Sequence, residues 1–126
     1  DGIISCKAAF EIISPILSDL PYEEFWIICL KRNNRFISKH KISTGGVSGT
    51  VVDMKIVFNI AIKELASGII LCHNHPSGNL NPSDQDIRLT KQAVEAGKLF
   101  DITIVDHIII AHNNFYSFTE NNNMYF

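Results

Sequence analysis

The sequence predicts one α/β domain in which a mixed β-sheet is flanked by helices, with the elements in the order αββαβαββ. The chain has 126 residues, a length that one hydrophobic core fills. Hydrophobic residues make up 46% and charged residues 19%, with a mean hydropathy of +0.12, which excludes a disordered, collagen-like or coiled-coil protein. Segments with helical periodicity alternate with short apolar runs typical of buried strands. A single domain over residues 1–126 is therefore expected.

Capping and turn residues mark where these elements begin and end. Serine and aspartate precede each predicted helix, and a glycine follows two of them. Pro15 interrupts the first helix and weakens that prediction. An Asn33-Asn34 turn joins the first two strands. The expected elements are a helix from Ser5 to Leu20, strands at 25–30 and 36–43, a helix from Asp53 to Gly68, a strand at 69–72, a helix from Ser83 to Gly97, and strands at 102–111 and 115–118.

Three segments are expected to be irregular. Glycines at positions 45, 46 and 49 indicate a loop before the second helix. The polar pair Asp106-His107 is expected to interrupt the strand at 102–111. Residues from Asn121 onward are expected to form a loose tail.

Charge and cysteine content restrict the functional class and the compartment. The net charge is -2 and the isoelectric point is about 6.2, which argues against a basic protein that coats nucleic acid. Cys6, Cys29 and Cys72 are odd in number and lie in apolar runs, which predicts reduced thiols in a cytoplasmic protein. No apolar run approaches the roughly 18 residues of a membrane span, and no secretory signal is visible. Because the sequence begins at Asp1, it is expected to be a fragment of a longer protein.

Two histidines near the middle of the chain have the spacing of metal ligands. His73 and His75 are two residues apart at the end of a predicted strand, so their side chains project from the same face. Asp86 follows eleven residues after His75, on the first turn of the next predicted helix. Two imidazoles and one carboxylate leave the fourth position of a tetrahedral site for water.

A purely structural interpretation of the same residues is also available. Ser83 and Asp86 match the capping box, in which an acidic residue closes the start of a helix. A single histidine is also more often a surface or core residue than a ligand. The His-x-His pair followed by Pro-Ser-Gly and then by the Ser/Asp pair is harder to explain by packing alone, and Ser83 can cap the helix and still serve a site.

These residues resemble a known signature. His73, His75, Ser83 and Asp86 follow the pattern H-x-H-x(7)-S-x(2)-D, which resembles that of the JAMM (MPN+) metalloproteases. The surrounding sequence resembles that of the bacterial RadC family, and the likeness extends over nearly the whole chain. The segments that carry it are LCHNHPSGNLNPSDQDI, KQAVEAGKL and VDHIII. The resemblance implies a JAMM/MPN+ domain with a cytidine deaminase-like fold, here the C-terminal part of a longer protein. RadC-like proteins usually carry an N-terminal helix-hairpin-helix-like region.

The resemblance also implies a role for each site residue. His73, His75 and Asp86 would bind zinc, and Ser83 would help to hold the oxyanion. The family's upstream glutamate, which acts as general acid and base, is assigned to Glu24, with Glu23 as the nearest rival. The implied reaction is hydrolysis of a peptide or isopeptide amide by metal-activated water, with a peptide or protein as the substrate.

Neighbouring residues receive weaker assignments. His107 either orients a metal ligand or is a hydrogen-bonded core histidine, and the second interpretation is favoured. Cys72 precedes His73 on a strand and so points to the opposite face, which argues against it as a ligand. The chain has no Cys-x-x-Cys, so the zinc nucleoside deaminase pattern fails.

Two other functions remain open at this point. Five of the eleven basic residues lie between positions 31 and 41, which suggests a hairpin that contacts phosphates. Together with the DNA-repair label attached to the RadC-like proteins that the chain resembles, this cluster raises the alternative of a DNA-repair-associated nucleic-acid-binding module or nuclease. The alternative explanation, a lysine-guarded edge strand, is favoured. Two histidines and one carboxylate also form the facial triad that holds iron in oxygen chemistry. The positions of Ser83 and Glu24 favour hydrolysis over that chemistry.

Overall fold

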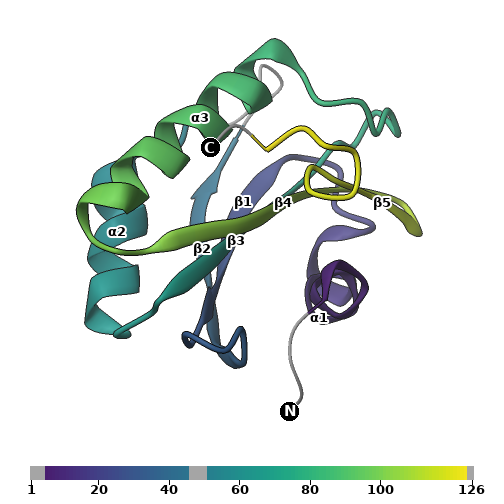
Figure 1. The fold of residues 1–126 in the computed structure, drawn as a ribbon. Helices are drawn as coiled ribbons and strands as arrows, with labels where there is room; N and C mark the ends of the chain where they lie inside the picture. Colours follow the sequence, from purple (N-terminus) through teal and green to yellow (C-terminus); the bar gives the residue numbers. More distant parts are fainter. Residues whose placement is uncertain (1–4, 46–50, 125–126) are drawn as a thin grey trace.

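A five-stranded sheet lies between two layers of helices in the computed structural model, which describes residues 5–45 and 51–124 (Figure 1). The predicted α/β fold class and element order are confirmed. Helices α2 and α3 cover one face of the sheet, and α1 covers the other. The elements are α1 (Cys6–Leu17), β1 (Glu24–Leu30), β2 (Phe36–Thr44), α2 (Met54–Lys63), β3 (Gly68–Asn74), α3 (Asp84–Leu99), β4 (Thr103–Ala111) and β5 (Asn114–Ser117).

The sheet has the strand order β2-β1-β3-β4-β5 and is mixed. Strands β3 and β4 are parallel and are joined through α3, whereas the other neighbouring pairs are antiparallel. The crossover returns the start of α3 to the edge of the sheet where β3 ends. Because β1 is antiparallel to β3, the first residues of β1 lie at that edge too. Three elements distant in sequence therefore meet at one end of the sheet.

Two apolar clusters hold the layers together. On one face, side chains from β1, β3 and β4 pack against Val57 and Phe58 of α2 and Ala93 of α3. On the other face, α1 buries a stripe at helical spacing against the sheet, as its sequence predicts. Cys72 belongs to this second cluster, so its thiol lies on the face away from His73, as expected.

The predicted helix starts are confirmed, but the helix ends differ. The side chains of Ser5, Asp53 and Ser83 each accept a hydrogen bond from a backbone amide in the first turn of their helix. Helix α1 tolerates Pro15 and ends at Leu17 rather than Leu20. Helix α2 ends at Lys63, five residues before Gly68, because Leu65 adopts a left-handed φ of 54° and the chain then turns into β3.

Gly97 lies inside α3 and does not end it, which corrects the predicted boundary. The reason is the close approach of the chain that leads into β4. The backbone amide of Ile102 donates to the Gly97 carbonyl at 2.9 Å, and a Cβ at position 97 would lie 2.2 Å from the carbonyl oxygen of Ile102. This glycine is needed for space.

Strand β4 is continuous, contrary to the predicted interruption at Asp106-His107. A register shift beside these residues, between Ile69 and Ile70 of β3, accommodates the irregularity. The buried Asp106 carboxylate accepts hydrogen bonds from the Ser117 hydroxyl at 2.6 Å and the Thr119 amide at 3.0 Å. These bonds hold the segment after β5, which is therefore not a loose tail over the described residues.

Two further expectations concern the remaining segments. Of the predicted glycine loop, Gly46 and Gly49 lie outside the described residues. None of the described helices is both long and apolar enough to cross a bilayer.

Substitution of Gly97 by alanine tests the close approach of α3 and β4. In an open helix this change would stabilise the protein by up to about 1 kcal/mol. Here we expect a loss of about 1–3 kcal/mol in the free energy of unfolding, because the added methyl group collides with the Ile102 carbonyl. Urea denaturation measures the change. Glu95→Ala, an exposed change on the same helix, serves as the control and should shift stability by less than about 0.5 kcal/mol. A Gly97→Ala protein at least as stable as wild type would contradict the packing described.

Candidate metal centre

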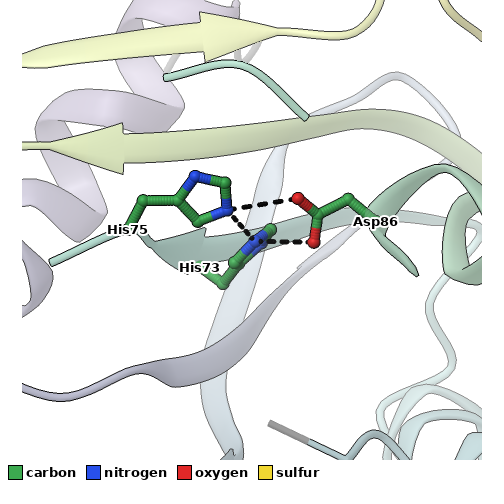
Figure 2. Close-up of side chains that lie close together, drawn as sticks. All are labelled: His73, His75 and Asp86. Atoms are coloured by element: carbon green, nitrogen blue, oxygen red, sulfur yellow. Dashed lines mark hydrogen bonds and ion pairs between the residues drawn. The ribbon is translucent and has the colours of Figure 1, made fainter. Parts of the chain in front are cut away.

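The end of β3 and the start of α3 bring three potential metal ligands together (Figure 2). His73 is the second-last residue of β3. His75 lies just beyond the strand, and its backbone amide donates to the Ile110 carbonyl of β4 at 2.8 Å. Asp86 lies in the first turn of α3. Nε2 of His73 and Nε2 of His75 are 3.0 Å apart, and each lies 3.1 Å from one carboxylate oxygen of Asp86. The structure thus assembles the three residues singled out in the sequence.

Contacts behind each imidazole orient its ring toward the cluster. His75 Nδ1 lies 2.6 Å from the carbonyl oxygen of Asn79, which can only accept, so Nδ1 carries a hydrogen and, when the ring is neutral, Nε2 presents its lone pair. His73 is 2% exposed, stacks on Phe25 at 5.6 Å, and makes a 2.9 Å hydrogen bond between its Nδ1 and Nε2 of His107. Both rings are therefore held with Nε2 facing Asp86.

The geometry fits a metal ion. Tetrahedral coordination with bonds of about 2.0–2.1 Å would separate the ligand atoms by about 3.3 Å. The corresponding separations here are 3.0–3.1 Å. With the hydrogen of the neutral His75 ring used on Asn79, its Nε2 and the Asp86 oxygens that converge there are electron-pair donors, which a cation between them would satisfy. The His73, His75 and Asp86 cluster can therefore bind a metal ion, with a fourth position left open.

The pKa values of Asp86 and His75 are shifted in opposite directions. Burial raises the pKa of Asp86, but hydrogen bonds from His73 and His75 and the nearby backbone outweigh it and hold that pKa far below its usual range. Burial lowers the pKa of His75, yet hydrogen bonds to Asp86 and to the Asn79 carbonyl, with the charges of Asp86 and Glu23, leave it raised. The site thus favours a positive charge opposite the Asp86 carboxylate.

Ser83 caps helix α3 and also lies beside the cluster. Its side chain accepts a hydrogen bond from the Asp86 amide at 3.1 Å, and its own amide donates to the Asp86 carboxylate at 2.8 Å, so the capping box is formed. This arrangement fixes the rotamer of Asp86 as well as the start of α3. Ser83 also lines the cleft in front of the cluster, with its hydroxyl proton available to donate.

The structure does not bring Glu24 to this cluster. Phe25 is the direct antiparallel partner of His73 and shares its face of the sheet, so Glu24 points to the opposite face. There its carboxylate accepts a hydrogen bond from the Trp26 indole at 2.9 Å and lies 3.8 Å from the Lys41 ammonium group. Its backbone amide donates to the Asn74 side chain at 2.9 Å, which holds β1 in place.

Glu23 lies on the side of the cluster. It is half-buried, lines the same cleft as His75 and Asp86, and contributes its charge to the raised pKa of His75. Its carbonyl accepts a hydrogen bond from the Gly45 amide at 2.8 Å, which anchors the residue to the end of β2. The odd-even alternation along β1 distinguishes the two glutamates, but only once Phe25 is known to face His73.

A cleft of about 1030 Å³ opens in front of the cluster. The segment before β1 forms one wall, the loop after β3 a second, and the exposed side of α3 a third. Its lining includes Tyr22, Val52, Pro76, Arg88 and Leu89. This volume is at the upper end of the range of small-molecule sites.

His107 satisfies both interpretations that its sequence leaves open. It is fully buried, and burial together with the charge of His73 lowers its pKa well below the ordinary value. It stacks on Phe118 at 4.5 Å as a core residue would. It also contacts His73 directly, so it is positioned to orient a ligand. His107 is thus a core residue that contacts the cluster through His73.

Fold and site together define an α/β domain with a two-histidine, one-carboxylate cluster that could hold a metal ion, and comparison with known proteins identifies the family. The family model of the RadC-like JAB domain matches residues 3–124. This chain belongs to the RadC family. It is 48% identical over 118 residues to a UPF0758 protein of Flavobacterium johnsoniae, a match covering 94% of this chain and 52% of that protein. A UPF0758 protein of Porphyromonas gingivalis is 42% identical over 116 residues, 92% of this chain and 51% of its own length. The chain thus spans about half the length of the curated relatives it matches.

We expect the metal-free protein to lose stability as the pH rises above about 6.5. His75 has a folded pKa above its ordinary value of 6.5, so its proton stabilises the fold below that pH and the contribution disappears as the pH rises through the folded pKa. Zinc should reverse the trend, because it replaces the proton among the acceptors and binds deprotonated histidine. At a zinc concentration 100 times the Kd, the gain is about 2.7 kcal/mol. Melting temperatures with chelator and with zinc measure both effects.

Other groups do not produce this trend. Asp86 has a lowered pKa, so its contribution is present above the ordinary value of 3.8 and is lost only in acid. The lowered pKa of His107 leaves its contribution constant above pH 6.5. His75→Gln should remove both the pH trend and the zinc effect, whereas His112→Gln, at an exposed histidine, should keep both. A melting temperature of the metal-free protein that increases as the pH rises above about 6.5 would contradict a stabilising proton between His75 and Asp86.

Proposed function

We propose that this chain is a zinc-dependent hydrolase of peptide or isopeptide amides. One observation carries the proposal: three ligand atoms converge on a point that leaves a fourth position toward a cleft of about 1030 Å³. Glu23 and Ser83 line the same cleft and supply a carboxylate and a hydroxyl group, which hydrolysis requires beside the metal. This reading agrees with the JAMM signature in the sequence.

Zinc is the metal that the donor set favours for this chemistry. Two imidazoles and one carboxylate bind zinc in hydrolases, and they also bind iron in oxygenases. The spacing of about 3 Å between ligand atoms suits a single metal ion bound to all three residues, and the likeness to the JAMM signature favours zinc over iron. Metal analysis of protein purified without chelators distinguishes the two, and iron would point to oxygen chemistry.

The residues around the cluster divide the steps of amide hydrolysis among them. Zinc in such a site acts as a Lewis acid and lowers the pKa of water to about 7. Glu23 faces the cleft and would accept the proton of the attacking water and pass it to the leaving nitrogen. Ser83, held by the Asp86 amide, would donate its hydroxyl hydrogen to the developing oxyanion. We assign the general acid and base to Glu23 rather than Glu24 because only Glu23 lines the cleft.

The position of the basic residues bears on the alternative of a nuclease. Lys31, Arg32 and Arg35 are exposed at the turn that joins β1 and β2, and β2 is the outer strand of the sheet. This turn lies at the far end of β1 from the metal cluster, about 20 Å away for a strand of 7 residues. Binding of nucleic acid by the basic turn remains a prediction, but the geometry offers no support for DNA cleavage that uses both features.

Paired glutamate variants test the assignment of the general base. Zinc-loaded protein is incubated with a proteome-derived peptide mixture, and new termini are identified by mass spectrometry. We expect Glu23→Gln to reduce cleavage by about 10²–10⁴-fold with zinc binding retained, because the proton acceptor is lost and the ligands are not. Glu24→Gln makes the same chemical change on the other face of the sheet and should cleave like wild type.

Two further samples make the result decisive. His75→Ala should lose both zinc and cleavage, and wild type treated with chelator should recover cleavage when zinc is restored. Normal cleavage by Glu23→Gln would remove Glu23 from the mechanism, and equal loss in both glutamine variants would contradict the choice of Glu23 over Glu24. Cleavage that persists in the metal-free protein would overturn the proposed function itself.

A further inference from the structure

A buried chain of polar side chains runs behind the metal cluster and links two of its three ligands. Thr90 of α3 and His107 of β4 are 0% exposed, and His73 is 2% exposed. The Thr90 hydroxyl lies 2.8 Å from the backbone carbonyl of Asp86 and 2.6 Å from His107 Nδ1. His107 Nε2 lies 2.9 Å from His73 Nδ1. Sequence reasoning gave no signal for Thr90, since a threonine inside a helix is ordinary.

The direction of each hydrogen bond in this chain follows from its first member. The Asp86 carbonyl can only accept, so the single hydrogen of the Thr90 hydroxyl is donated to it. The hydroxyl oxygen then has only lone pairs to offer to His107. Nδ1 of His107 must therefore carry a hydrogen and donate to Thr90.

The next step depends on the burial of His107. The ring stacks on Phe118 at 4.5 Å and meets the edge of Phe25 at 6.0 Å, and its two nitrogens bond to the neutral Thr90 hydroxyl and to His73 Nδ1. A second proton would place a charge in these apolar surroundings, which is costly. The imidazole is thus neutral with Nε2 bare, and that nitrogen accepts the hydrogen of His73 Nδ1.

We infer that Thr90 and His107 are positioning residues that hold His73 in the Nδ1–H tautomer, so that its Nε2 lone pair faces the metal. This inference rests on the metal centre proposed above. His75 obtains the same tautomer directly from the Asn79 carbonyl. His73 obtains it through a neutral histidine, whose tautomer is decided by a hydroxyl group bonded to the backbone of the third ligand, Asp86.

The relay predicts a specific failure when the hydroxyl is removed. Without Thr90 to accept from Nδ1, the His107 proton can move to Nε2. That nitrogen would then donate to His73 Nδ1 and place the His73 hydrogen on Nε2, where it blocks the metal. A ligand histidine normally donates its second nitrogen to a carbonyl or carboxylate, and loss of such a partner weakens metal binding about 10–100-fold.

The test compares Thr90→Val, which removes the hydroxyl at nearly constant volume, with Thr90→Ser, which keeps it. Nitrogen NMR of histidine-labelled, metal-free protein reports which ring nitrogen of His107 and His73 carries the hydrogen. Wild type and Thr90→Ser should show His107 with a bare Nε2. Thr90→Val should populate the other tautomer and raise the zinc dissociation constant about 10–100-fold in chelator competition.

Each outcome bears on a distinct statement. A hydrogen on Nε2 of His107 in wild type overturns the relay, and this measurement needs neither variant folding nor zinc. Thr90→Val with wild-type tautomer and zinc affinity overturns it as well, even if that variant melts at a lower temperature, because Thr90 would then be a packing residue. Failure of wild type to bind zinc would overturn the proposed function and leave the tautomer result to decide the relay.

Discussion

The parallel pairing of β3 with β4 is the constraint on which the site depends. Parallel strands need a crossover, and here the crossover is α3, whose first turn returns to the end of β3. The same pairing places Leu71 beside His107 and His73 beside Ile109, so both histidines face α3. A metal ligand, the residue that contacts it from behind and the helix that carries Asp86 are thereby brought to one face. Antiparallel pairing of β1 adds the segment that contains Glu23.

The polar groups near the site lie in an otherwise apolar layer, and their hydrogen bonds explain how this is tolerated. Asp86, Thr90 and His107 are buried, yet each one is bonded to another polar group. Among the described residues, the hydroxyl of Ser43 is the one buried polar side-chain atom without a partner. The cluster differs from the other polar groups because its bonds leave lone pairs facing one another. Its polar residues make a cation the natural occupant.

Much of this arrangement could be predicted from the sequence. The His-x-His spacing depends only on strand alternation, and the Ser83/Asp86 spacing depends only on the first turn of a helix, so both are local. The opposite orientation of Cys72 follows from the same alternation. Helix starts were predictable for a similar reason, since a cap acts within a few residues.

What could not be predicted depends on how parts of the chain approach one another in the folded protein. Gly97 lies inside α3 because the Ile102 carbonyl approaches it closely. The general preference for glycine at helix ends does not take such a contact into account. The role of His107 depends on a neighbour 34 residues away in sequence. The choice between Glu23 and Glu24 depends on which residue of β1 pairs with His73, a matter of register. Local patterns define the ligands, and tertiary contacts define what surrounds them.

Because Glu23 and Glu24 are adjacent, the alternation of side chains along the chain decides which carboxylate lies in the cleft beside the cluster. Two identical carboxylates, one peptide bond apart, have different environments: one lies in a cleft lined by metal ligands, and the other accepts from an indole on the reverse side of the sheet. Displacement of β1 by a single position would exchange their environments without any change in composition. Composition and motif alone do not separate these two carboxylates, whereas counting odd and even positions from Phe25, which lies opposite His73, does.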